Sequence, residues 1–140
     1  FHPSGNLATK LKTVEDLMIK GSKIPFIHEN SSMKNALKIL SKKNLGVLII
    51  RNKTKKTIGI ITDGDLKRAI EKNNNIKDIK LKKIMTKNPI SIDQNELAAK
   101  ALSLMTSNKK ITSLCVYKNK KKNQTVGLIH IHNILNANIN

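Results

Sequence analysis

Aromatic side chains are almost missing from this chain of 140 residues, which contains two Phe, one Tyr and no Trp. Proteins that bind single-stranded nucleic acid stack the bases on aromatic side chains. Arg, whose planar fork reads base edges, occurs only as Arg51 and Arg68. The composition therefore argues against both kinds of nucleic-acid recognition.

Cysteine and long apolar runs are also scarce. The single Cys115 excludes an internal disulfide, and its place in an apolar run favours a small buried thiol. The longest apolar runs, such as Val47–Ile50, are too short to span a membrane. No leader sequence is visible, and because the chain begins at Phe1 we expect it to be a fragment. These features fit a cytoplasmic protein in a reducing compartment.

Acidic residues number only nine against 27 Lys and Arg, which gives a formal net charge of +18. A basic surface is expected of proteins that bind nucleic acid through its phosphates. However, Lys, Asn and Ile supply 62 of the 140 residues, and all three have A/T-rich codons. We therefore favour an ordinary solvated surface and expect no specific nucleic-acid partner.

Apolar periodicity in the first half predicts a helix, two strands and a second helix. Residues 31–40 carry apolar side chains at helical spacing, with one of two serines as the N-cap. Residues 46–50 and 58–61 have the composition of short strands, and the Lys-rich link between them predicts a hairpin. Leu66 lies on the apolar face of the second helix.

The same order returns in the second half. Residues 93–105 predict a helix, residues 114–117 and 126–130 predict a second hairpin, and residues 131–135 begin a last helix.

Matching positions lie about 67 residues apart, as with Met18 and Met85 or Gly59 and Gly127. We interpret the chain as a duplicated β-α-β-β-α unit. A unit of about 60 residues is marginal alone. Two copies packed as a pseudo-twofold pair give the expected α/β (α+β) fold.

The stretch "GIITDGD" (59–65) carries the most distinctive chemistry. Thr62 can cap the following helix, with Asp65 at the N3 position of a capping box. The same groups suit a nucleotide, because a helix N-terminus and the Thr62 hydroxyl can bind a phosphate while Asp65 accepts from ribose hydroxyls. Gly59 permits a close approach. Asp63 is interpreted as a turn residue, since no base or nucleophile accompanies an acid pair here.

The duplication and this stretch resemble a tandem pair of CBS domains. That family's nucleotide-binding pattern is Gly-x-x-Thr/Ser-x-x-Asp, and it matches Gly59, Thr62 and Asp65. The resemblance implies a Bateman module that binds a nucleotide in a cleft between the repeats and forms a homodimer.

The second copy departs from the pattern. It reads "GLIHIHN" from Gly127, with His130 at the hydroxyl position and Asn133 at the carboxylate position, so we expect unequal sites. His130 and His132 would share a face of a strand and could ligate a metal. No third ligand is evident, so we expect no metal. We place His130, His132 and Asn133 among the candidate contacts for an anionic effector.

Three longer stretches resemble arabinose-5-phosphate isomerases of the Kdo pathway, in which a sugar-isomerase (SIS) domain precedes a CBS pair. They are "FHPSGNLATKLKTVEDLM", "GIITDGDLKRAI" and "GLIHIHNIL". The resemblance implies that residues 1–14 are a linker from an absent SIS domain, residues 15–76 the first CBS repeat and residues 77–140 the second.

By the same resemblance, the full-length protein interconverts ribulose 5-phosphate and arabinose 5-phosphate for lipopolysaccharide or capsule synthesis. His2 would be its catalytic histidine, active in acid–base chemistry only when the SIS domain is present. The family reads His-Pro-Gly-Gly where this chain has His2-Pro-Ser-Gly. We expect the fragment to have no isomerase activity and to need no cofactor. The full-length protein would be a tetramer.

The resulting expectation is a regulatory CBS pair that senses a nucleotide or nucleotide-sugar such as AMP, ATP or CMP-Kdo. Two alternatives stay open. One is a structural dimerisation module with empty sites. The other is a charge-driven nucleic-acid binder, whose affinity would fall steeply with salt.

Overall fold

A computed structural model describes residues 11–107 and 111–137 and divides the chain into two compact units. One unit is continuous and comprises Ser22–Pro89, whereas the other joins the N-terminal segment as far as Gly21 to the chain from Ile90 onward. Within the described residues, no helix has the length and apolar character needed to cross a membrane.

The continuous unit contains a four-stranded sheet in the order β1-β2-β3-β4. β1 is parallel to β2, and the β2–β3 and β3–β4 pairs are antiparallel. Its elements are β1 (Phe26–His28), α3 (Met33–Lys43), β2 (Val47–Arg51), β3 (Thr57–Thr62), α4 (Asp63–Lys72), a 3-10 turn (Ile76–Asp78), α5 (Leu81–Ile84) and β4 (Thr86–Lys87).

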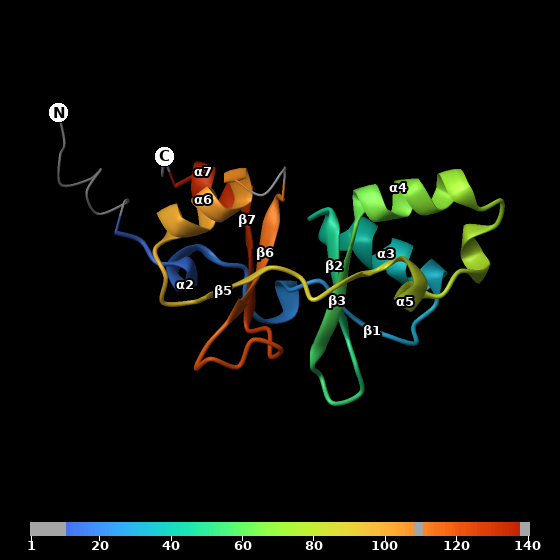
Figure 1. The fold of residues 1–140 in the computed structure, drawn as a ribbon, viewed down its shortest axis with the longest axis horizontal. Coiled ribbons are helices and arrows are strands. Elements are labelled where there is room, and N and C mark those ends of the chain that lie inside the picture. The colour runs from blue at the N-terminus through green and yellow to red at the C-terminus, as the bar shows by residue number, and fades with distance from the viewer. Residues whose placement is uncertain (1–10, 108–110, 138–140) are drawn as a thin grey trace. The chain divides into compact units, whose positions relative to one another are not determined.

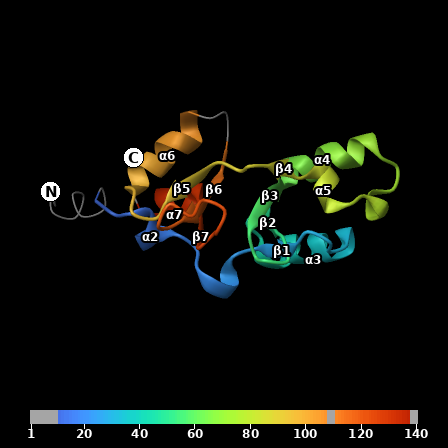
Figure 2. The same ribbon diagram turned by 60° about the horizontal axis from the view of Figure 1, so that its bottom comes forward.

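Helices α3 and α4 lie on the same side of the β2–β3 hairpin (Figures 1 and 2). Alternation along the strands explains this arrangement, because side chains two residues apart share a face of a sheet. Leu48 and Ile50 of β2 and Ile61 of β3 are fully buried and form a core with Met33 of α3 and Leu66 of α4. The hairpin and both helices predicted in this half are confirmed.

The second unit contains a three-stranded sheet in the order β5-β6-β7. β5 is parallel to β6, and β6 is antiparallel to β7. Its elements are α2 (Val14–Leu17), β5 (Ser91–Asp93), α6 (Ala98–Ser107), β6 (Ser113–Tyr117), β7 (Gly127–His130) and α7 (Ile131–Leu135).

The helix predicted over residues 93–105 is wrong at its start. Residues 91–93 form β5, which pairs with β6, and α6 begins only at Ala98. Leu97, expected on the apolar face, lies outside the helix and is 43% exposed. The remaining periodicity holds, since Ala98, Ala101 and Met105 are fully buried.

The segment that contains α2 is part of the second unit's core. Val14 is fully buried there and its N–H donates to the carbonyl of Glu96. Ile19 pairs with Leu128 of β7 through two main-chain hydrogen bonds. In the same way, α5 and β4, which follow the first repeat in sequence, pack in the continuous unit. The compact units therefore differ from the repeats as they run in sequence.

Glycine makes room for each of these segments. A Cβ atom on Gly127 would collide with the sulfur of Met18, and one on Gly59 would lie 2.7 Å from the sulfur of Met85. Met18 and Met85 were matched by the repeat, so both units use the same contact. Cys115 is buried, as expected, and burial raises the pKa of its thiol to about 11.

Candidate functional site

The best-defined polar site lies where β3 ends and α4 begins. Thr62 has an extended backbone, and its Oγ1 accepts from the Asp65 N–H at 3.2 Å. The Thr62 N–H in turn donates to Oδ2 of Asp65 at 3.0 Å. This reciprocal pair is the capping box that the sequence predicted.

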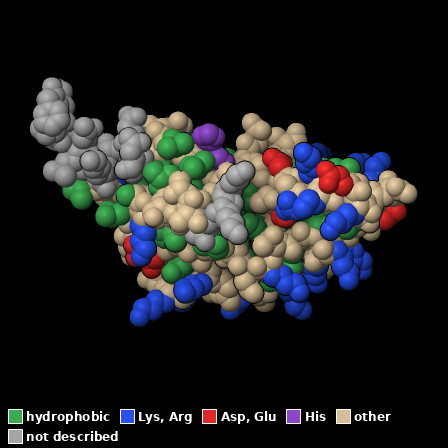
Figure 3. Space-filling view, turned by 45° about the horizontal axis from the view of Figure 1, so that its top comes forward, with side chains coloured by type: hydrophobic (Ala, Val, Ile, Leu, Met, Phe, Trp, Pro, Cys, Tyr) green, Lys and Arg blue, Asp and Glu red, His purple; other side chains and the backbone are tan. Residues whose placement is uncertain are grey.

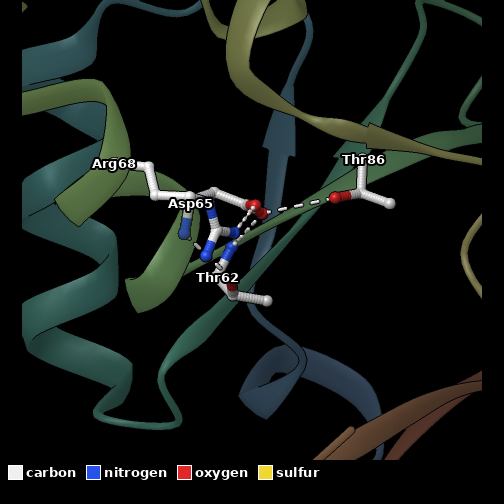
Figure 4. Close-up of polar contacts among 4 residues, drawn as sticks. All are labelled: Thr62, Asp65, Arg68 and Thr86. Atoms are coloured by element: carbon white, nitrogen blue, oxygen red, sulfur yellow. Dashed lines mark hydrogen bonds and ion pairs between the residues drawn. The ribbon is translucent and has the colours of Figure 1, made fainter. Parts of the chain in front are cut away.

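Two further side chains contact the Asp65 carboxylate (Figure 4). Nη2 of Arg68 lies 2.7 Å from Oδ1 and forms an ion pair with it, while the hydroxyl of Thr86 lies 3.5 Å from Oδ2. The Asp65 side chain is only 10% exposed, whereas that of Arg68 is 63% exposed. The carboxylate is therefore largely buried, whereas Arg68, its ion-pair partner, is exposed.

The carboxylate of Asp65 retains spare hydrogen-bonding capacity. Its two oxygens offer about four lone-pair positions. Thr62 and Thr86 use two on Oδ2, and Arg68 uses one on Oδ1. A ligand with two vicinal hydroxyls needs two positions, so one partner must leave. Arg68 is best suited, because an exposed ion pair adds little stability.

Gly59 lies on β3 next to this site and is buried. A Cβ atom there would lie 2.8 Å from the main-chain oxygen of Thr86 as well as against Met85. The close approach expected at Gly59 is therefore made by the chain's own β4. Gly59 brings Thr86 close to Asp65 and is itself covered.

A hollow of about 410 Å³ extends from Asp65 along α4 towards α5. Ala69, Ile79 and Ile84 provide apolar surface, and the basic side chains Arg68, Lys72 and Lys83 also line it. Figure 3 shows Lys and Arg side chains gathered beside acidic ones on this part of the surface. The hollow thus combines apolar surface with an excess of positive charge.

In the second repeat, the equivalent helix start is built from different groups. Nδ1 of His130 accepts from the His132 N–H at 3.1 Å, and Oδ1 of Asn133 accepts from the His130 N–H at 2.8 Å. His130 therefore caps α7 in place of a threonine, and Asn133 replaces the aspartate. Burial, and to a lesser degree the charge of His132, lower the pKa of His130.

His130 and His132 do not share a strand face, because β7 ends at His130 and His132 lies in α7. Their rings stack at a centroid distance of 4.9 Å, with Nδ1 of His130 committed to the cap. Across the residues that the structure describes, no group of three His, Cys, Asp or Glu side chains could hold a metal. His2 lies outside the described residues.

Comparison with known families gives a direct result. The model of the CBS domain matches residues 14–72 and again residues 76–140. The chain belongs to the CBS domain family.

The relatives of this CBS pair are longer proteins. It is 36% identical over 139 residues to the uncharacterized protein RP505 of Rickettsia prowazekii (strain Madrid E), covering 99% of this chain and 42% of the relative. It is 34% identical over 139 residues to arabinose 5-phosphate isomerase KdsD of Salmonella typhimurium (strain LT2), covering 99% of this chain and 41% of the relative. The CBS pair thus spans about two fifths of the curated relatives it matches.

Solved CBS pairs have the same fold. The CBS pair of protein MJ0100, in complex with 5'-methylthioadenosine and S-adenosyl-L-methionine, superposes with a TM-score of 0.77 at 27% identity over 90% of this chain and 94% of that one. CBSX2 of Arabidopsis thaliana, in complex with AMP, superposes with a TM-score of 0.73 at 22% identity, over 90% of this chain and 95% of that one. The α/β fold of duplicated CBS units is confirmed.

Sequence reasoning placed Thr62 and Asp65 together in the CBS pair's first repeat, and His130 with Asn133 in the second. It missed Arg68 and Thr86. Arg68 was detectable, because residues three apart on a helix are neighbours. Thr86 lies 21 residues from Asp65, and no local pattern indicates their contact.

Proposed function

We propose that this CBS pair is the regulatory part of an arabinose-5-phosphate isomerase and binds a nucleotide or nucleotide-sugar at Asp65. The full-length protein would be cytoplasmic, with an SIS domain before the pair and His2 among its catalytic residues. The CBS pairs would dimerise within a tetramer. The effector would alter or help assemble the catalytic part, and the fragment alone would have no activity.

The state of Asp65 is the observation that carries this proposal. A carboxylate at a helix start with few solvent contacts needs hydrogen-bond donors, and here it has one unfilled position and one displaceable partner. Vicinal hydroxyls of a ribose supply such donors. A purely structural cap would need only the two hydrogen bonds shared with Thr62.

The comparisons support the parent and the ligand class in different ways. Similarity to KdsD over nearly the whole chain supports a sugar-phosphate isomerase as the parent. Adenosine-containing ligands of MJ0100 support a ribose as the group that reaches Asp65. AMP and ATP are thus candidate effectors by likeness. CMP-Kdo is a candidate because an end product commonly regulates the pathway that makes it.

Calorimetric titration of AMP, ATP and CMP-Kdo into the 140-residue chain tests the proposal. The informative variant is Asp65→Asn, because Asn133 fills the same capping role in the second repeat. We expect this variant to fold normally and to bind at least about tenfold more weakly, since a charge-assisted hydrogen bond is lost.

The matched control is Asp63→Asn, which removes the same charge from the same helix end. Asp63 is exposed and takes no part in the capping box. If both variants lose affinity equally, the loss comes from the change in net charge and not from a contact with Asp65. Absence of binding by all three compounds would leave the structural alternative as the better description.

A further inference from the structure

The basic hollow along α4 is not needed by the diol contact at Asp65. A ribose reaches the carboxylate at the start of the helix, whereas Lys72 lies seven residues, or about 10 Å, further along. The family pattern that matches Gly59, Thr62 and Asp65 includes none of the basic residues in the hollow. Their presence therefore calls for a separate account.

The charges in the hollow are poorly balanced. Arg68 has Asp65 as its partner, and the neighbouring Lys82 is paired with Glu29 at 2.9 Å. Within residues 11–107 and 111–137, neither Lys72 nor Lys83 forms an ion pair with a carboxylate. Asp65 is the only acidic residue in the lining, so displacement of Arg68 from its carboxylate would leave three cations around the hollow without an ion-pair partner.

We propose that this hollow is an anion subsite, in which Arg68, Lys72 and Lys83 bind a second anionic group of the ligand whose hydroxyls reach Asp65. This inference rests on the proposed function. When the diol binds, Arg68 leaves Oδ1 and turns its planar fork to a phosphate or carboxylate, a geometry that guanidinium groups favour. The apolar surface of Ala69, Ile79 and Ile84 would pack against the ligand's uncharged part.

The ligand class follows from the spacing. Cations that extend about 10 Å along the helix from Asp65 fit a ligand with two separated anionic groups better than a nucleoside monophosphate. A nucleoside di- or triphosphate has this character, and so does a nucleotide-sugar acid with a phosphodiester and a carboxylate. The shared feature is an anion beyond the first phosphate.

The test compares adenosine, AMP, ADP, ATP and CMP-Kdo by calorimetry at constant ionic strength. For the unmodified chain, we expect affinity to rise at least about tenfold from AMP to ADP or CMP-Kdo. In the Lys72→Gln/Lys83→Gln variant, this gain should fall to within about twofold, with adenosine binding unchanged. A gain in affinity with ADP and ATP alone identifies a further phosphate as the bound anion. A gain with CMP-Kdo alone identifies the sugar carboxylate.

The control variant is Lys67→Gln/Lys77→Gln, which removes the same total charge from exposed positions outside the hollow. It should keep the full gain. Arg68→Gln should weaken ADP binding while adenosine binds as well or better, because Oδ1 is freed. Weaker adenosine binding in that variant would instead make Arg68 a residue that positions Asp65.

The two proposals can fail separately. Asp65-dependent adenosine binding without a gain for ADP, ATP or CMP-Kdo overturns the subsite and leaves the effector site. A gain that the Lys72/Lys83 variant retains also overturns it. If no nucleoside, nucleotide or nucleotide-sugar binds, the effector site fails, and inorganic pyrophosphate decides the subsite. Pyrophosphate binding lost only in the Lys72/Lys83 variant supports the subsite, and any other result contradicts it.

Discussion

Replacing Gly59 by alanine should destabilise the protein and disturb the effector site together. The new Cβ atom would lie 2.7 Å from the sulfur of Met85 and 2.8 Å from the carbonyl oxygen of Thr86. Ordinary contacts begin near 3.4 Å, so the main chain of β4 must move by about 0.6 Å. Overpacking of this kind costs about 1–3 kcal/mol in the free energy of unfolding.

Urea unfolding followed by circular dichroism measures this change. The matched control is Gly64→Ala, because the nearest atoms to its new Cβ belong to the flexible end of Arg68, at 3.3 Å. Gly64 lies in α4, where alanine is favoured over glycine by up to about 1 kcal/mol. Gly59→Ala should therefore lower the free energy of unfolding, and Gly64→Ala should raise it. A Gly59→Ala protein as stable as the unmodified chain would refute the reasoning.

Two further predictions concern the helix caps. Thr62→Ala should lower the free energy of unfolding by about 1 kcal/mol, and Thr62→Ser should restore it, as measured by urea unfolding. His130 has a pKa below that of an unfolded histidine, so the unfolded state binds its proton first as the pH falls. The free energy of unfolding should therefore decrease as the pH falls below about 6.5. His130→Thr, which keeps an N-cap acceptor, should lessen this decrease, as measured by urea unfolding at several pH values. A pH profile identical in both proteins would contradict that assignment.

Local patterns in the sequence were sufficient for the two hairpins and for the starts of α3, α4 and α7. Thr62 and Asp65 could be placed because a capping box involves residues only three apart. The strand at residues 91–93 was missed because it has three residues, and its pairing with β6 involves a segment more than 20 residues away. A short strand has too few alternations to be distinguished from the helix that follows.

Contacts between distant segments could not be predicted. Val14 has the apolar character of a core residue, but its sequence does not say which core it joins. In the same way, the sequence does not say which unit β4 joins, and the contact between Thr86 and Asp65 depends on that. The basic hollow was also missed. Lys72 and Lys83 belong to different helices, and Lys is so frequent in this chain that no single pair of lysines is conspicuous.

The exchange of Met18 and Met85 between repeats has a consequence for how the chain can be divided. Each sequence repeat begins with the segment that carries its methionine, but that segment packs in the compact unit formed by the other repeat. The sequence repeats and the compact units are therefore circular permutations of each other. A cut at residue 76 would leave Gly127 without Met18 and Gly59 without Met85, and would remove Val14 from its core. Cuts after Gly21 and after Pro89 instead release one hydrophobic core in a single piece, and the residues of the other core all stay in the two remaining segments. Residues 22–89 are thus an insertion within the other unit, although the sequence reads as two repeats in succession.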